Sequence, residues 1–141
     1  NSSKKNVYIT TSYFVPPLLL MRALKNAAKR GVDVKIILQG KTDQNFVRQF
    51  AINKYGELLK HGVHIYEWPN SILHSKTIVV DDIWSSIGSC NMDGRSFFLN
   101  YEANIAITDK IFALQMEKQF IIDLTIADKI NYKQWKNLCK S

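Results

Sequence analysis

Residues 74–91 of the sequence read HSKTIVVDDIWSSIGSCN, and this stretch indicates a β-hairpin. Two apolar runs rich in β-branched residues, Leu73–Val80 and Ile83–Ile87, are separated by Asp81 and Asp82. Aspartate is favoured in turns because its short side chain hydrogen-bonds the local backbone and tolerates a positive φ. The stretch therefore predicts two neighbouring antiparallel strands joined by a tight turn at these two aspartates.

The sequence before the hairpin alternates between strand-like and helix-like segments. The expected strands are Val7–Thr11, Val32–Leu38 and Val63–Glu67, and the expected helices are Pro17–Arg30 and a segment from an N-cap at Asp43 to about Lys60. Gly31 and Gly62 are expected to end the two helices. A β-α-β-α-β order predicts parallel strands with helices packed against the sheet.

The sequence after the hairpin has a period of two. Between Leu99 and Thr108 apolar and polar residues alternate, which is typical of a strand with one polar face. The apolar set is Leu99, Tyr101, Ala103, Ile105 and Ile107, and the polar set is Asn100, Glu102 and Asn104. A helix from about Asp109 to Leu124 and an amphipathic tail around Trp135 follow. We therefore expect residues 1–141 to form one α/β domain with a mixed, largely parallel sheet flanked by helices on both faces.

The composition is that of a globular domain with a basic surface. Of 141 residues, 46% are hydrophobic and 22% are charged, which excludes a disordered or collagen-like chain. The net charge of +7 favours anionic partners: nucleic acid, acidic lipid headgroups or phosphorylated small molecules. Cys90 and Cys139 lack CxxC spacing, so we expect free thiols in a reducing compartment.

The chain has no sequence signal for membrane insertion. No stretch reaches the roughly 18 apolar residues of a membrane-spanning helix, and no signal peptide is recognisable. Because the sequence opens Asn1-Ser2-Ser3 without an initiator methionine, we expect a soluble piece of a longer protein.

The reactive residues of the hairpin stretch are His74 and Lys76. Residues two apart on a strand project to the same face, so we expect the two side chains to stand side by side. An imidazole with an ordinary pKa of about 6.5 is partly neutral near pH 7 and can attack a phosphodiester. The lysine would neutralise the non-bridging oxygens, on which negative charge develops. The pair predicts phosphoryl-transfer chemistry.

Four further residues fit this chemistry. We expect Gly88 to let the backbone approach a ligand closely, and Ser89 and Asn91 to donate hydrogen bonds to phosphate. Glu102, on the polar face of its strand, is expected to accept the proton of one imidazole nitrogen of His74. That contact would leave the other nitrogen free to attack.

These residues form the pattern His-x-Lys-x4-Asp-x6-Gly-Ser-x-Asn, and the chain resembles the phospholipase D superfamily at every fixed position. Four flanking stretches make it similar to the C-terminal catalytic half of bacterial cardiolipin synthases. They are Tyr13-Phe14-Val15-Pro16, Arg30-Gly31-Val32-Asp33-Val34, Gly40-Lys41-Thr42-Asp43 and Arg95 to Glu102. The similarity spans about Tyr8 to Leu124.

The resemblance implies phosphatidyl transfer through a phosphohistidine. One phosphatidylglycerol donates its phosphatidyl group, glycerol leaves, and a second phosphatidylglycerol accepts the group to give cardiolipin. The resemblance implies no metal or organic cofactor, and a peripheral, cytoplasmic-facing catalytic domain on an anionic bacterial cell membrane. It also implies two motifs per active site. This chain has one, so the second would come from a missing half of the protein or from a homodimer mate.

Carried over residue by residue, the resemblance assigns five residues to the site: His74, Lys76, Ser89, Asn91 and Glu102. His74 would be either the nucleophile or the general acid that protonates the leaving glycerol, and the sequence leaves both roles open. Asp81 and Gly88 complete the motif. Because Asp81 falls on the opposite strand face from His74, we expect it to support the turn rather than touch substrate.

Two alternatives stay open. One is a homodimeric nuclease or phosphodiesterase of the same superfamily, which the basic charge suits because nucleic-acid affinity rests on neutralised phosphates. The other is a catalytically silent binding half. Two surfaces also allow two interpretations. The basic residues beside Leu18–Met21 would meet anionic lipid headgroups, or that helix would pack its apolar stripe on the sheet with its charges in solvent. Phe97, Phe98 and Tyr101 would form an acyl-chain lip, or one of the two phenylalanines would be exposed without such a role. Tyr101 is expected in the core.

Overall fold

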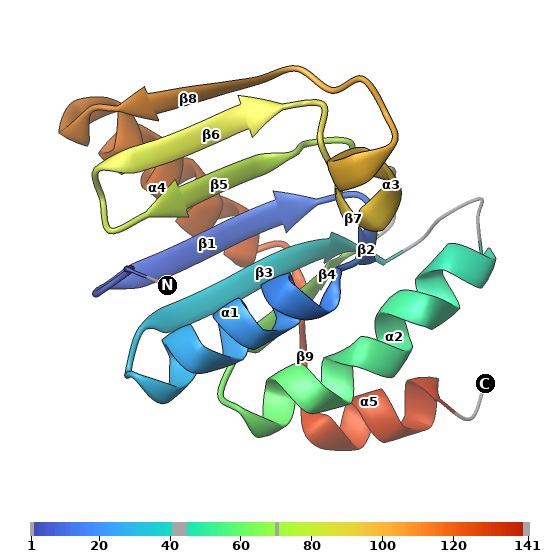
Figure 1. The fold of residues 1–141 in the computed structure, drawn as a ribbon. Coiled ribbons are helices and arrows are strands. Elements are labelled where there is room, and N and C mark those ends of the chain that lie inside the picture. The colour runs from blue at the N-terminus through green and yellow to red at the C-terminus, as the bar shows by residue number, and fades with distance from the viewer. Residues whose placement is uncertain (1, 41–44, 70, 140–141) are drawn as a thin grey trace.

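The structure, a computed structural model, describes residues 2–40, 45–69 and 71–139. Within these residues seven strands form one sheet in the order β8-β6-β5-β1-β3-β4-β9 (Figure 1). Their bounds are β1 Asn6–Thr11, β3 Asp33–Gln39, β4 His64–Trp68, β5 Thr77–Val80, β6 Trp84–Gly88, β8 Asn104–Thr108 and β9 Asp128–Ile130. The predicted hairpin is confirmed, since β5 and β6 pair antiparallel with Val80 opposite Trp84.

The sheet is mixed, as predicted, but parallel pairing is confined to its centre. β1 pairs in parallel with β3, and β3 with β4, because a helix carries the chain back across the sheet between each pair. The pairs β1–β5, β5–β6, β6–β8 and β4–β9 are antiparallel. The expectation of a largely parallel sheet is corrected in this respect: the β-α-β-α-β series sets the direction of three strands only.

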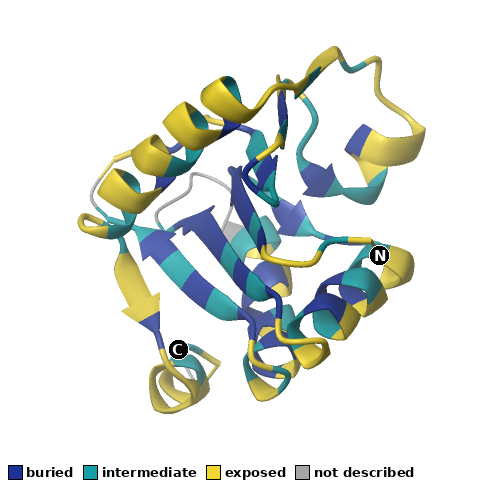
Figure 2. Ribbon diagram, turned by 90° about the vertical axis from the view of Figure 1, so that its left-hand side faces the viewer, coloured by how far each residue is buried: buried dark blue, intermediate teal, exposed yellow. Residues whose placement is uncertain are grey.

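Helices cover both faces of the sheet, which confirms the predicted layers. They are α1 Leu18–Lys29, α2 Asn45–Lys60 and α5 Tyr132–Leu138 on one side and α4 Lys110–Leu124 on the other (Figure 1). Leu24 of α1 and Tyr55 of α2 belong to the larger buried cluster. On the other face Phe120 of α4 stacks on Tyr8, with ring centroids 4.8 Å apart. Figure 2 shows that the buried residues concentrate in the central strands.

The turn between β5 and β6 has the tight geometry that the sequence predicts. Asp81 and Asp82 have φ angles of 55° and 57°, a region that aspartate adopts more readily than most residues. The backbone N–H of Ile83 donates to the Val80 carbonyl at 3.2 Å and closes the turn. Two central residues with positive φ match the right-handed twist of the flanking strands, as in a type I′ turn.

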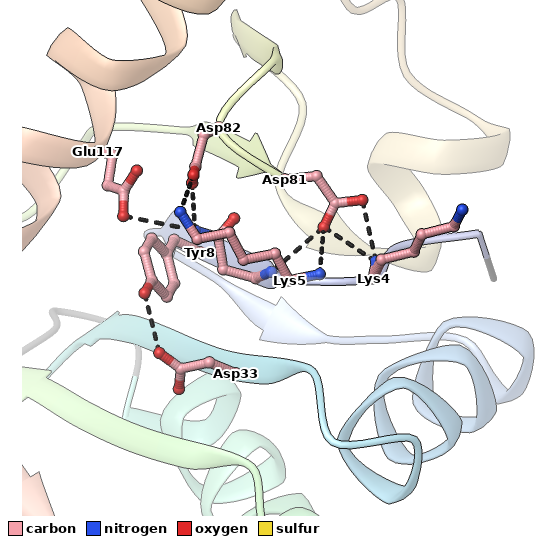
Figure 3. Close-up of polar contacts among 8 residues, drawn as sticks. Lys4, Lys5, Tyr8, Asp33, Asp81, Asp82 and Glu117 are labelled. Carbon is pink, nitrogen blue, oxygen red and sulfur yellow. Dashed lines mark hydrogen bonds and ion pairs between the residues drawn. The ribbon is translucent and has the colours of Figure 1, made fainter.

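The same turn binds the beginning of β1 (Figure 3). The Asp81 carboxylate accepts hydrogen bonds from the backbone N–H groups of Lys4, Lys5 and Asn6 at 2.8–3.2 Å. Asp82 accepts a hydrogen bond from the Asn6 side-chain amide at 2.6 Å and forms an ion pair with Lys5. These contacts support the structural role expected of Asp81.

Several elements differ from the sequence prediction. β5 begins at Thr77 and β8 at Asn104, so the segments 73–76 and 99–103 lie outside the strands. The unpredicted elements are β9, the short strands β2 Phe14–Val15 and β7 Met92–Asp93, and the short helix α3 Gly94–Phe98. The predicted N-cap Asp43 and the neighbouring positions Lys41 and Thr42 lie outside the described residues.

Strand β8 forms one edge of the sheet, and its apolar residues are exposed. Ile105 is 67% exposed, because the edge position leaves this strand little covered. Tyr101 precedes β8 in the irregular segment 99–103 and is fully exposed, so the prediction that Tyr101 packs in the core is wrong. Leu18 and Leu19 at the start of α1 are also exposed, at 71% and 76%. In the described ranges no helix is long and apolar enough to cross a membrane.

Candidate active site

The motif residues meet at one end of the sheet, on the right in Figure 1, because four strand ends coincide there. β1 ends at this edge, β5 starts there opposite β1, β6 ends there, and β8 starts there opposite the end of β6. The segments that extend beyond these strand ends are residues 12–13, 74–76, 89–91 and 102–103. Segments far apart in sequence are therefore neighbours in space.

The Lys76 side chain is buried at this edge, and its ammonium group contacts two neutral oxygens. Its ammonium group donates to the Ser12 hydroxyl at 3.2 Å and to the His74 backbone carbonyl at 2.8 Å, and the residue is 9% exposed. Burial lowers the pKa of Lys76, and the negative charge of Glu102 opposes that shift. Because the direct partners carry no charge, the positive charge of Lys76 stays available to an anionic ligand.

The side chains of His74 and Lys76 do not stand side by side as predicted. Lys76 is buried whereas His74 is exposed, because the segment that holds them is irregular. The neighbouring strand β1 pairs with β5 only as far as Thr10 opposite Thr77, so residues 74–76 have no strand to pair with. Among the described residues, none makes a side-chain hydrogen bond to the His74 imidazole.

Glu102 contacts Ser89 rather than His74. The Ser89 hydroxyl donates to the Glu102 carboxylate and accepts a hydrogen bond from the Ala103 backbone N–H at 3.0 Å. The hydrogen bond from Ser89, followed by further side-chain hydrogen bonds and the charge of Lys76, lowers the pKa of Glu102. The expected Glu102–His74 contact is absent from the described part of the chain, because Glu102 precedes β8 instead of lying on its polar face.

The Asn91 side chain is anchored through its oxygen. Its Oδ1 accepts a hydrogen bond from the Tyr13 backbone N–H at 3.3 Å and lies 3.5 Å from the Thr11 hydroxyl. An amide that accepts through its oxygen leaves its NH₂ group as a donor on the other side. This arrangement is compatible with the expected hydrogen bond from Asn91 to a phosphate oxygen.

Gly88 is required by the neighbouring strand. A Cβ at this position would overlap the Ala103 carbonyl and the Asn104 side chain, and would lie 2.6 Å from the Asn104 Cα. The glycine thus allows a close approach of the chain entering β8. The expected close approach of a ligand to Gly88 stays a prediction.

A cleft of about 550 Å³ opens beside Asn91. Val47 of α2 and Gly94–Ser96 of α3 line it, together with Tyr13 and Asn100. Arg95 brings an exposed positive charge to the cleft, and none of the ion pairs within the described residues involves it. The cleft therefore offers cationic and amide groups next to the motif.

Exposed aromatic pairs occur on both helices that line the cleft. Phe46 and Phe50 of α2 pack edge to face with ring centroids 4.7 Å apart, and Phe97 and Phe98 of α3 lie 6.3 Å apart. Phe46 and Phe98 are 75% and 73% exposed. Phe97 and Phe98 thus lie on helix α3, and both are exposed, Phe97 less than Phe98.

A second cavity, of about 580 Å³, is lined mainly by apolar residues of α1, β1, β5 and β6, among them Leu24, Ile78 and Trp84, and also by the motif residue Asp81. Among the residues that the structure describes, no three His, Cys, Asp or Glu side chains gather to hold a metal ion. Cys90 and Cys139 are free.

Sequence reasoning missed the residues that follow the end of β1. Ser12 contacts Lys76, and Thr11 and Tyr13 contact Asn91. One signal was available: Thr11 ends a buried central strand and the polar residues Ser12 and Tyr13 follow it, and ligand sites in α/β sheets commonly lie beyond the carboxyl ends of such strands.

Comparison with known proteins assigns the family. The family described as cardiolipin synthase, PLD-like domain, matches residues 1–124. The chain belongs to this family. The PLD-like domain is 44% identical over 136 residues to a cardiolipin synthase of Clostridium perfringens, and 38% identical over 135 residues to cardiolipin synthase 2 of Staphylococcus epidermidis. The alignments cover 96% of this chain but 29% and 28% of those relatives, so the chain spans less than a third of their length.

Solved structures share the fold of the PLD-like domain. The phospholipase D family member Nuc of Salmonella typhimurium superposes with a TM-score of 0.79 at 25% identity, covering 92% of this chain and 84% of Nuc. Phosphatidylserine synthase of Haemophilus influenzae superposes with a TM-score of 0.75 at 17% identity, covering 99% of this chain and 39% of that protein. The second likeness concerns the fold alone. Together they confirm the predicted phospholipase D-like fold.

Proposed function

We propose that this chain is a catalytic domain of a phosphatidyltransferase that converts two molecules of phosphatidylglycerol into cardiolipin and glycerol. The proposal is supported by one observation: Lys76, which contacts the His74 backbone, and Asn91 lie on segments at the same end of the sheet, and Asn91 lines a cleft of about 550 Å³. The membership of the chain in the cardiolipin synthase PLD-like family supports this substrate class.

In the first half of the reaction a histidine nitrogen attacks the phosphorus of one phosphatidylglycerol. The N–P bond forms, the bond from phosphorus to the glycerol oxygen breaks, and a general acid protonates the leaving glycerol. The Lys76 ammonium stabilises the negative charge on the non-bridging oxygens. The Asn91 NH₂ group donates a hydrogen bond to one of them, because its oxygen is already bound.

In the second half a glycerol hydroxyl of another phosphatidylglycerol attacks the phosphohistidine. The new P–O bond forms, the N–P bond breaks, and the hydroxyl proton passes to the group that had acted as the acid. Water in place of the glycerol hydroxyl would give phosphatidic acid. Transfer therefore requires that the acceptor lipid occupy the site before water does.

The reaction needs a nucleophile and a separate acid–base group. Of the histidines, His61 lies at the end of α2 and His64 at the start of β4, which runs parallel to β1, so both sit at the opposite end of the sheet from His74. His74 supplies one role, and a second motif supplies the other. That motif comes from the remainder of the polypeptide or from a second copy of the chain.

Glu102 and Ser89 complete the proposed site when the hydrogen bond between them breaks and each takes a new hydrogen-bond partner. When Glu102 turns from Ser89 to the His74 imidazole, it orients the ring for attack. The same movement frees the Ser89 hydroxyl, whose single proton is otherwise given to Glu102, to donate to phosphate. Gly88 and Asp81 maintain the strand contacts on which this end of the sheet depends.

We place the domain on the cytoplasmic surface of an anionic bacterial membrane, with the cleft facing lipid. The net charge of +7 favours such a surface. The exposed Phe98, Leu99 and Tyr101 next to the cleft would enter the headgroup region, where aromatic side chains are favoured.

The test is product analysis on phosphatidylglycerol vesicles with the complete parent polypeptide and its His74→Ala variant. Cardiolipin that forms with the parent and disappears with the variant supports the proposal. Phosphatidic acid alone would make the protein a hydrolase, and no lipid turnover would contradict the proposal. An unchanged His74→Ala variant would indicate a catalytically silent half.

A homodimeric phosphodiesterase or nuclease is the second candidate. The observation in its favour is that the chain matches 84% of Nuc, so a protein built almost entirely of this domain exists. DNA cleavage by the chain, steeply weakened by salt and without lipid turnover, would favour this candidate.

A further inference from the structure

The end of β1 contacts two of the proposed site residues. Thr11 and Ser12 are 0% and 7% exposed, and they lie where the central strand ends and the chain turns toward β2. Ser12 contacts Lys76, and the next residue, Tyr13, contacts Asn91. The short segment that directly follows the central strand thus touches both the cation and the amide that would bind phosphate.

The contact between Ser12 and Lys76 determines where the ammonium group points. An ammonium has three donors. Two are used by the Ser12 hydroxyl and the His74 carbonyl, which leaves one for a ligand. Since His74 offers a backbone oxygen, Ser12 is the only partner of this pair whose side chain can be changed without altering the motif.

Thr11 holds the turn that carries the second contact. Its hydroxyl donates to the Tyr13 carbonyl at 3.0 Å and accepts from the Met92 backbone N–H at 3.3 Å. These bonds connect residues 11–13 to the segment that follows β6. The Tyr13 N–H is thereby placed against the Asn91 oxygen.

We propose that Ser12 and Thr11 are positioning residues for phosphoryl transfer: Ser12 holds the Lys76 ammonium toward the phosphate, and Thr11 holds the turn that orients the Asn91 amide. This inference rests on the proposed function for its catalytic consequence. The contact between Ser12 and Lys76 can be tested without any activity. A hydroxyl that accepts from the ammonium stabilises the protonated amine, so its removal lowers the pKa of Lys76 further than burial alone does.

The first experiment is an NMR titration of Lys76 in the complete parent polypeptide labelled with ¹³Cε-lysine, with the signal assigned by Lys76→Arg. Ser12→Ala is expected to move the titration of Lys76 to lower pH, and Ser12→Thr, which keeps a hydroxyl, to restore it. The matched control is Ser85→Ala. Ser85 is a buried serine like Ser12, and its hydroxyl has no hydrogen-bond partner in the described part of the chain. An unchanged Lys76 titration in folded Ser12→Ala would overturn the inference, whether or not the protein turns over lipid.

The second experiment measures cardiolipin formation by the same proteins. Ser12→Ala is expected to lower kcat by about 10- to 100-fold, the range for loss of a hydrogen bond to a charged group, with little change in KM. The alkaline limb of its pH–rate profile should move to lower pH, because Lys76 loses its proton earlier. Ser85→Ala should change neither quantity. A loss of activity with an unshifted pH profile would mean that Ser12 acts only on folding.

Thr11→Val tests the second contact, because valine has nearly the shape of threonine without the hydroxyl. We expect a lower kcat with an unshifted Lys76 titration, and recovery in Thr11→Ser. Thr11→Val with the kcat of the parent would remove Thr11 from the inference. Failure of the parent to make cardiolipin would contradict the proposed function alone, since the NMR titration still decides the role of Ser12.

Discussion

Ser89 donates its single hydroxyl proton to the carboxylate of Glu102. Its oxygen meanwhile accepts a hydrogen bond from the Ala103 N–H at 3.0 Å. The hydroxyl is therefore fully engaged, and it cannot donate to a phosphate unless Glu102 moves. The two residues that the sequence assigns to separate tasks, phosphate binding and histidine orientation, are linked through one hydrogen bond.

The first prediction concerns this link. Glu102→Gln should lower kcat for cardiolipin formation at least about 10-fold, because an amide is a weaker acceptor than a carboxylate for the imidazole proton. KM should change little, since Lys76 and Asn91 remain in place. Steady-state kinetics of the parent polypeptide measure both constants, with Asp128→Asn on β9 as an exposed control far from the motif. A Glu102→Gln variant with full kcat would exclude an orienting role for Glu102.

The second prediction concerns the acidic cluster at the other end of β1. Burial, followed by the hydrogen bond and charge of Asp82, raises the pKa of Glu117, and the Asn6 amide lies 3.4 Å from the Glu117 carboxylate (Figure 3). A raised pKa in the folded state means that Glu117 contributes stability below its unfolded pKa, which is lost as the pH rises through the folded pKa. Relative to the parent, Glu117→Gln should therefore gain stability as the pH rises above the ordinary glutamate pKa of about 4.3.

Urea unfolding at several pH values measures this gain. The matched control is Glu57→Gln on α2, for which the sign is opposite. The hydrogen bond and charge of Lys25 lower the pKa of Glu57, so its contribution is present above the unfolded pKa and lost as the pH falls. Parallel pH profiles for the two variants would contradict the account of Glu117.

The sequence predicted the elements that bury a clear apolar face. β1, β3, α1 and the second strand of the hairpin appear within one residue of their expected bounds, because their burial follows the periodicity of their own residues. The first residues of β5 and β8 could not be predicted in this way, although their last residues were. β5 has no partner strand before Thr77, because β1 turns away after Thr11. The apolar residue Leu73 is therefore buried without being part of a strand.

In the candidate site, too, the position of the motif was predictable from the sequence, whereas the contacts made by irregular segments were not. The residue spacing and the family resemblance identified the motif, and its segments do meet at one end of the sheet. The contacts of Lys76 with Ser12 and of Glu102 with Ser89 depend on irregular segments, whose conformation no periodicity describes. Helix α3 was within reach of the sequence, since the Asp93 side chain accepts a hydrogen bond from the Ser96 N–H at 2.8 Å as an N-cap. The predicted strand begins at Leu99, and no element is predicted for residues 94–98.

The third prediction concerns the packing of β6 against the chain entering β8. Gly88→Ala should destabilise the fold by about 1–3 kcal/mol, because the new methyl group would overlap the Ala103 carbonyl and the Asn104 side chain. Gly94→Ala is the matched control. A Cβ there meets nothing within 4 Å, and the residue opens α3, so the change should be neutral or slightly stabilising. Urea unfolding of both variants gives the comparison, and equal stabilities would contradict the packing argument.

The fourth prediction concerns the membrane-facing side of the domain. Phe98→Ser should weaken binding to phosphatidylglycerol vesicles by about 10-fold, because it removes an aromatic group that is 73% exposed beside the cleft. Its thermal stability should be unchanged, since an exposed side chain contributes little to the core. Ile111→Ser is the control: Ile111 is 72% exposed but lies at the start of α4, beyond the far end of β8. Vesicle sedimentation of the parent polypeptide and the two variants measures the effect. Equal losses for both would indicate nonspecific hydrophobic binding, and no loss for Phe98→Ser would place the lipid-facing surface elsewhere on the molecule.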